Sequence, residues 1–239
     1  MRRLNLVLLC HFMILCCNGQ SEKLTITPLT SHFFIYTTYN NYQDTKIPAN
    51  GMYLVTEKGA ILFDTPWDST QFQPLLDSIK ARHHKNVVMA FATHWHSDKT
   101  AGLEYYRQQG IKTFTTVQTD ELCKSNGKKR AEFLMSKDTV FQFGGYRFQT
   151  YYPGPAHTAD NIVIWFPAQR ILYSGCLIKG AKDEDLGFLG DGDKKNYLSA
   201  LMKVQKKFPD PRFITVAHSD WHDLNSLKHS IEMARRLQD

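Results

Sequence analysis

Apolar and polar positions follow two periods along the chain. Short apolar stretches bounded by glycine, proline or polar residues are typical of β-strands, and they occur at 33–36, 52–56, 60–63, 86–93, 112–115, 141–143, 146–151, 161–166, 170–173 and 213–217. Apolar residues three and four positions apart predict amphipathic helices, and they occur at 69–83, 101–109, 117–124, 194–207 and 223–237. The chain is therefore predicted to be an α+β protein.

The order of these elements indicates two similar halves, each rich in strands that are followed by helices. A sheet must bury one face against another layer. We therefore predict an αββα sandwich, in which two mixed β-sheets pack face to face and helices cover the outer faces. Neither a tandem repeat nor a Pro/Ser-rich linker divides residues 20–239, so this segment is predicted to form a single domain.

The first residues are typical of a secretory signal peptide. A basic start precedes the apolar run 4–17, which is shorter than the ~20 residues that a spanning helix needs. Small residues follow this run, so we predict that residues 1–19 are a signal peptide and that the mature protein is periplasmic. The alternative is a lipoprotein that is acylated at Cys16 or Cys17 and anchored by its lipid.

Composition narrows the class of partner. The 239 residues carry a formal charge of +6, dispersed in short groups such as 128–130 and 206–207. A nucleic-acid groove needs its basic residues on one face with interleaved aromatic residues. We therefore expect a solvated surface with no nucleic-acid partner, a monomer, and no stable membrane insertion unless the chain is lipidated.

Cysteine usage excludes a disulfide scaffold. Three of the five cysteines lie in the predicted signal peptide, which leaves Cys123 and Cys176. This pair could form one disulfide in an exported protein. Alternatively, Cys123 is a buried apolar residue on its predicted helix and Cys176 is free for other chemistry.

Three potential metal ligands alternate in the stretch ATHWHSDKTAG, directly after a predicted strand. Side chains two positions apart point the same way in an extended segment but diverge by roughly 200° on a helix. His94, His96 and Asp98 can therefore converge if the segment is extended before it turns into the next helix. Imidazole nitrogen and carboxylate oxygen are ligands that zinc accepts, although histidines at strand ends are also common surface residues.

Three further residues follow other predicted strands. His157 lies in a Gly/Pro loop, Cys176 comes shortly after the strand 170–173, and His218 follows the strand 213–217. Loops at strand ends are where converging ligands are expected. Taken alone, each of these residues is more often a surface or small buried side chain. His222 competes with His218 but lies four residues beyond the strand.

These motifs together resemble those of the metallo-β-lactamases of subclass B1, whose fold is the αββα sandwich. The residues that carry the resemblance are THWHSD at 93–98, GPAHTADN at 154–161, GCLIK at 175–179, AH at 217–218, NGM at 50–52 and LFDTPW at 62–67. The resemblance spans nearly the whole chain after residue 19.

The resemblance implies two zinc ions per chain. His94, His96 and His157 would hold one ion, and Asp98, Cys176 and His218 would hold the other. It further implies that Lys179 binds the substrate carboxylate and that Asp98 acts in catalysis. Asp64 is a candidate for orienting the ligands, because ligating imidazoles usually donate their second N–H to a carboxylate or carbonyl; a plain buried aspartate is the alternative.

The implied function is zinc-dependent opening of the β-lactam ring of penicillins, cephalosporins and carbapenems by a zinc-bound hydroxide, which confers antibiotic resistance. Four positions depart from the family pattern: Ala156 and Ala217 replace frequent glycines, Lys99 a frequent arginine and Phe188 a frequent asparagine. One alternative is a hydrolase of the same fold that acts on thioesters, lactones or phosphodiesters. Such enzymes commonly carry H-x-H-x-D-H, and Lys99 in place of the last histidine argues against them. A non-catalytic zinc-binding relative is the other alternative.

Overall fold

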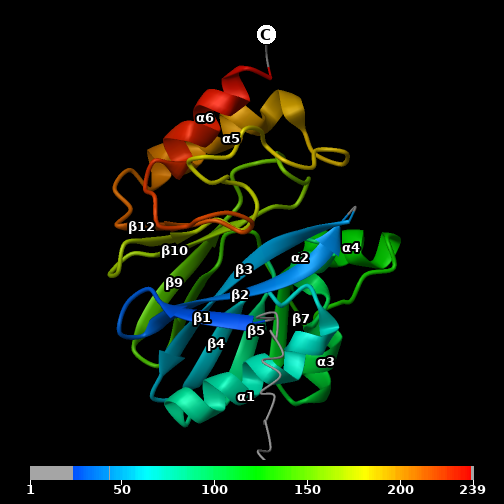
Figure 1. Cartoon of the computed structure of the whole chain (residues 1–239), viewed down its shortest axis with the longest axis vertical. Coiled ribbons are helices and arrows are strands. Elements are labelled where there is room, and N and C mark those ends of the chain that lie inside the picture. The colour runs from blue at the N-terminus through cyan, green and yellow to red at the C-terminus, as the bar shows by residue number, and fades with distance from the viewer. Residues whose placement is uncertain (1–23, 43, 238–239) are drawn as a thin grey trace, which may run out of the picture.

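The computed structural model describes residues 24–42 and 44–237. These residues form two β-sheets that pack face to face, with helices on both outer sides (Figure 1). This arrangement confirms the predicted αββα sandwich. The predicted signal peptide, residues 1–19, lies outside the described residues. None of the helices in the described part is long and apolar enough to cross a membrane.

Both sheets are mixed. The larger sheet has the strand order β1-β2-β3-β4-β5-β6-β7, antiparallel up to β4 and parallel from there on. Its strands are β1 (Leu24–Pro28), β2 (Phe33–Tyr42), β3 (Thr45–Thr56), β4 (Gly59–Phe63), β5 (Val87–Phe91), β6 (Lys112–Thr116) and β7 (Phe133–Met135). The smaller sheet has the order β12-β11-β10-β9-β8, in which only β11 and β12 are parallel. Its strands are β8 (Val140–Phe143), β9 (Tyr146–Tyr151), β10 (Val163–Phe166), β11 (Ile171–Tyr173) and β12 (Phe213–Thr215).

The helices cover the outer faces of the two sheets (Figure 1). The helices are α1 (Phe72–His83) after the 3₁₀ turn η1 (Ser69–Gln71), α2 (Ser97–Thr100), α3 (Leu103–Gln108), α4 (Val117–Ser125), α5 (Lys194–Lys207) and α6 (Ser226–Arg235). Leu75 and Tyr106 bring α1 and α3 into the apolar cluster on the larger sheet. Leu201 and Ile231 bring α5 and α6 into the cluster on the smaller sheet.

An aromatic core joins the two sheets. Phe63 and Phe91 of the larger sheet are fully buried against Phe148 and Phe166 of the smaller sheet. The rings of Phe63 and Phe166 meet edge to face with centroids 5.3 Å apart, a preferred geometry for aromatic pairs. Cys123 and Cys176 are both free, so this packing, and not a disulfide, holds the described chain together.

Two edge strands were not predicted. β1 pairs with β2 along its whole length, and β7 pairs in parallel with β6. β7 is only three residues long and apolar throughout, Phe133–Met135, so the strand is too short to show the alternation that could mark it. The predicted hairpin around Gly144 and Gly145 is confirmed; both glycines have positive φ, a conformation that costs glycine nothing.

Candidate metal centre

The first three predicted ligands lie where β5 passes into α2. The strand ends at Phe91, His96 has an extended backbone (φ −63°, ψ 153°), and Asp98 lies in the first turn of α2. Thr100 donates its hydroxyl hydrogen bond to the His96 carbonyl at 2.9 Å, which fixes the start of the helix. The segment therefore turns into a helix at Ser97, four residues before the predicted helix 101–109.

Three imidazole rings form a nearly equilateral triangle. The ring centroids of His94 and His96 are 4.9 Å apart, those of His94 and His157 5.0 Å, and those of His96 and His157 5.1 Å. Nε2 of His96 lies 2.8 Å from Oδ2 of Asp191, on the loop before α5. Because that carboxylate occupies Nε2, Nδ1 is the nitrogen of His96 left for a cation.

The other two rings have buried nitrogens without a hydrogen-bond partner among the described residues: Nε2 of His94 and both nitrogens of His157. Burial lowers the pKa of both histidines well below its ordinary value, so each ring is neutral and offers a lone pair. Buried polar atoms are normally paired. A cation between the three rings would satisfy these nitrogens.

A second set of donors lies beside the first. Oδ2 of Asp98 is 3.4 Å from Sγ of Cys176 and 3.1 Å from Nε2 of His218. Sγ and Nε2 are 3.3 Å apart. On the other side of its ring, His218 donates from Nδ1 to the Pro48 carbonyl at 2.8 Å, which directs Nε2 toward the cluster.

The electrostatics of this second set are those of a cation site. Burial would raise the pKa of Asp98, but Lys99 and His218 hold it well below its ordinary value. Burial would lower the pKa of His218, but Cys176 and Asp98 raise it to about 10. His218 thus carries a proton that a metal ion would replace. One nitrogen, one sulfur and one oxygen donor within 4.8 Å of one another fit zinc, as do the three histidines.

Asp64 supports the centre less directly than predicted. No imidazole contacts it; it accepts hydrogen bonds from the backbone N–H of Thr93 at 2.8 Å and from Oγ1 of Thr93 at 3.1 Å. The same Oγ1 lies 3.2 Å from Nδ1 of His94, so one hydroxyl separates Asp64 from the ligand. Tyr173 also donates to Asp64 at 2.7 Å. These contacts hold Asp64 at a φ of 63°, which is unusual for a residue other than glycine.

Lys99, a departure from the family pattern, is fully buried beneath the centre. Its Nζ lies 3.0 Å from Oδ2 of Asp98 and 3.7 Å from Oδ2 of Asp64. Burial would lower the pKa of Lys99, but Asp98, Cys176 and Asp64 raise it. Lys99 is therefore a charged link between the predicted ligand Asp98 and the supporting residue Asp64.

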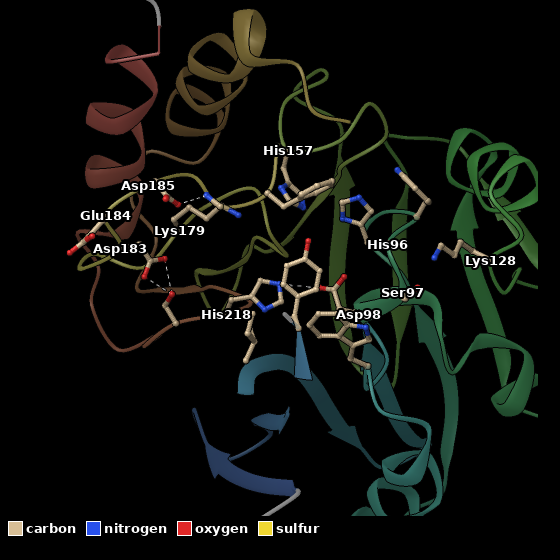
Figure 2. Close-up of a pocket in the computed structure, with 17 residues that line it drawn as sticks. His96, Ser97, Asp98, Lys128, His157, Lys179, Asp183, Glu184, Asp185 and His218 are labelled. Carbon is tan, nitrogen blue, oxygen red and sulfur yellow. Dashed lines mark hydrogen bonds and ion pairs between the residues drawn. The ribbon is translucent and has the colours of Figure 1, made fainter. Parts of the chain in front are cut away.

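Members of both donor sets line a cavity of about 580 Å³. Figure 2 shows His96 and Asp98 reaching this cavity from one segment, and His157 and His218 from two others, with Lys179 beside them. Aromatic residues form much of the remaining wall: Tyr42, Trp67, Trp95 and Phe188. His222 belongs to neither donor set; it is exposed and pairs with Asp220.

Lys179 lies at the wall of the cavity, beside His157 and His218. Only 7% of the residue is exposed, and burial lowers the pKa of its ammonium group. A buried cation at the cavity wall gains strongly from an anionic partner. Its backbone N–H is held by Oγ of Ser230 in α6 at 2.9 Å.

The sequence profile of the metallo-β-lactamase superfamily matches residues 45–218 of this chain. The chain belongs to this superfamily. It is 38% identical over 219 residues to metallo-β-lactamase type 2 of Elizabethkingia meningoseptica, covering 92% of this chain and 88% of the relative. It is 35% identical to metallo-β-lactamase IND-1 of Chryseobacterium indologenes, with 87% of each chain covered.

Solved structures agree with these sequence relatives. A metallo-β-lactamase from Pontibacter korlensis superposes with a TM-score of 0.86 at 34% identity, covering 89% of this chain and 99% of that one. The solved neighbours are metallo-β-lactamases of the B1 type, which confirms the resemblance noted in the sequence. The matched region contains every predicted ligand from His94 to His218.

Proposed function

We propose that this protein is a β-lactam hydrolase that uses two zinc ions, one held by His94, His96 and His157 and one by Asp98, Cys176 and His218. The observation that carries the proposal is that the three imidazole rings lie together beside the cluster of Asp98, Cys176 and His218, at a cavity with the buried cation of Lys179 at its wall. Penicillins, cephalosporins and carbapenems each present a carboxylate that Lys179 can bind. Opening their ring would confer antibiotic resistance.

The chain's own residues have defined tasks in this reaction. Zinc supplies Lewis acidity, which activates water as a nucleophile near neutral pH. Asp98 stays ionised because Lys99 contacts its Oδ2, so its carboxylate can accept a hydrogen bond from the attacking water. Lys179 fixes the substrate through its carboxylate, and the rings of Trp67 and Phe188 cover the bound molecule and exclude bulk water.

The proposal includes export. Residues 1–19 would be removed as a signal peptide, leaving a monomeric periplasmic enzyme without a nucleic-acid partner. The mass of the protein recovered from the periplasm tests this proposal. A chain that begins at Gln20 supports it, whereas a lipid attached to Cys16 or Cys17 would replace it with an anchored lipoprotein.

A substrate panel tests the reaction itself. The purified protein should hydrolyse a carbapenem or a cephalosporin in preference to a thioester, a lactone and a phosphodiester at equal concentration. Preference for one of the last three would assign another hydrolase activity on the same fold. A protein that binds zinc and turns over none of them would be a non-catalytic relative.

Replacing Lys179 with alanine is expected to raise KM about tenfold or more and to change kcat less, because the lost contact is made equally in the bound substrate and the transition state. Steady-state kinetics with a cephalosporin measures both values. Lys182, which is exposed on the same loop, provides the matched control: Lys182→Ala should leave KM unchanged. Equal values of KM for Lys179→Ala and the unsubstituted protein would remove Lys179 from the site.

A further inference from the structure

The loop that carries Lys179 is tied back on itself by Asp183. Oδ2 of Asp183 accepts a hydrogen bond from the backbone N–H of Gly180 at 2.8 Å, and the backbone N–H of Asp183 donates to the Gly180 carbonyl at 3.1 Å. The loop is also fixed to helix α6. Ser230 holds the backbone of Lys179, and Nε2 of His229 donates to the Asp183 carbonyl at 2.7 Å.

The same carboxylate reaches across to the segment that carries His218. Oγ of Ser219 lies 2.6 Å from Oδ1 and 2.7 Å from Oδ2 of Asp183, a contact that Figure 2 shows as dashed lines at Asp183. Hydrogen bonds to an ionised carboxylate are roughly twice as strong as neutral ones. Asp183 therefore joins the two chain segments that supply Lys179 and His218.

Ser219 is held from its other side by β3. Its carbonyl accepts a hydrogen bond from Nδ2 of Asn50 at 2.9 Å, while Pro48 of the same strand holds Nδ1 of His218. The contact with the Lys179 loop is also closely packed. A Cβ atom added to Gly180 would lie 2.5 Å from Cβ of Ser219, so the loop has little freedom to move relative to Ser219.

We propose that the Asp183–Ser219 contact is a brace that keeps the substrate-binding Lys179 and the metal ligand His218 in register. Asp183 is then a positioning residue that acts through Ser219. Loss of the brace weakens both the binding of a cation to Asp98, Cys176 and His218 and the binding of the substrate carboxylate. The part that concerns substrate rests on the proposed function; the part that concerns the cation does not.

Four proteins test the brace: the unsubstituted chain, Asp183→Ala, Ser219→Ala and the double variant. Cobalt(II) is the probe for the second donor set, because its charge-transfer absorption from a thiolate requires Cys176. Each single substitution is expected to weaken cobalt binding about tenfold, the low end of the effect of losing a supporting contact around a metal ligand. Each is also expected to raise KM for a cephalosporin. The double variant should bind cobalt no more weakly, and have a KM no higher, than the more affected single variant. The effects of two substitutions that remove the same contact are not additive.

A direct contact between Asp183 and substrate predicts a different pattern. In that case Asp183→Ala raises KM, Ser219→Ala does not, and cobalt binding is unchanged in both, which would overturn the brace. Additive losses in the double variant would overturn it as well. Asp183→Asn keeps one acceptor oxygen, so its cobalt affinity and its KM should lie between those of the unsubstituted protein and Asp183→Ala.

A matched control separates the brace from general loosening of a loop. Asp223 also accepts two hydrogen bonds from its own loop, from the backbone N–H and Nδ2 of Asn225, but it contacts neither Lys179 nor Ser219. Asp223→Ala should lower Tm without changing cobalt binding. If Asp183→Ala does not fold, Asp183→Asn takes its place in the cycle. If the unsubstituted protein hydrolyses no β-lactam, the proposed function fails, and the cobalt data still decide whether the brace exists.

Discussion

Replacing Cys176 with serine is expected to lower the rate of β-lactam hydrolysis by roughly a hundredfold or more. Loss of a residue that only supports a metal ligand already lowers metal affinity or activity by about 10–100-fold. The physical reason is the loss of the only sulfur donor in the second set, 3.3 Å from His218 and 3.4 Å from Asp98. A serine hydroxyl does not ionise at neutral pH and binds zinc poorly. Initial rates with a carbapenem, measured beside the zinc content of the same sample, check the prediction.

Cys123 provides the matched control for this substitution. It is equally buried but belongs to neither donor set. Cys123→Ser should keep both the rate and the zinc content. Parental rates and zinc content in Cys176→Ser would instead show that the second donor set does not hold a catalytic metal.

Replacing Lys99 with methionine is expected to lower the free energy of unfolding of the metal-free protein by about 3–5 kcal/mol, the usual effect of removing one partner from a buried ion pair. Methionine fills a similar volume but leaves Asp98 and Asp64 without the cation that lies 3.0 Å and 3.7 Å from them. Denaturant unfolding in the presence of a chelator measures the difference. Lys99→Arg keeps the positive charge, so it should lower the free energy of unfolding by less than Lys99→Met.

An exposed ion pair gives the comparison for Lys99. Lys85 lies 3.1 Å from Glu57, whose side chain is almost fully exposed, so Lys85→Met should change the free energy of unfolding little. A similarly small change for Lys99→Met would mean that the charge of Lys99 is not needed beneath the metal centre.

The sequence predicted the layers of the fold, and it placed the six candidate ligands at strand ends, because both depend on local patterns. Each ligand follows a strand whose apolar run is visible, and His94, His96 and Asp98 share one short stretch. Edge strand β7 escaped prediction because its three residues, Phe133–Met135, are too few to show a strand period. Its parallel hydrogen-bonded pairing with β6 is what makes it a strand.

Two residues that support the candidate ligands, Asp191 and Pro48, could not be predicted, because tertiary contacts alone bring them to the site. Asp191 reaches His96 across 95 positions of sequence, and Pro48 reaches His218 across 170. The sequence indicated that Asp64 orients a ligand, but the hydroxyl group of Thr93 lies between Asp64 and His94. Lys99 could have been recognised as a supporting residue, since it directly follows a predicted ligand at the start of a helix.

Chelation tests the central claim, that the two donor sets form a zinc centre which hydrolyses β-lactams. Purified residues 20–239 would be assayed with a carbapenem and a cephalosporin before and after treatment with a chelator, and again after zinc is restored, with zinc measured on each sample. We expect about two zinc ions per chain, loss of turnover with loss of zinc, and recovery when zinc returns. Undiminished turnover in the zinc-free protein would contradict the account.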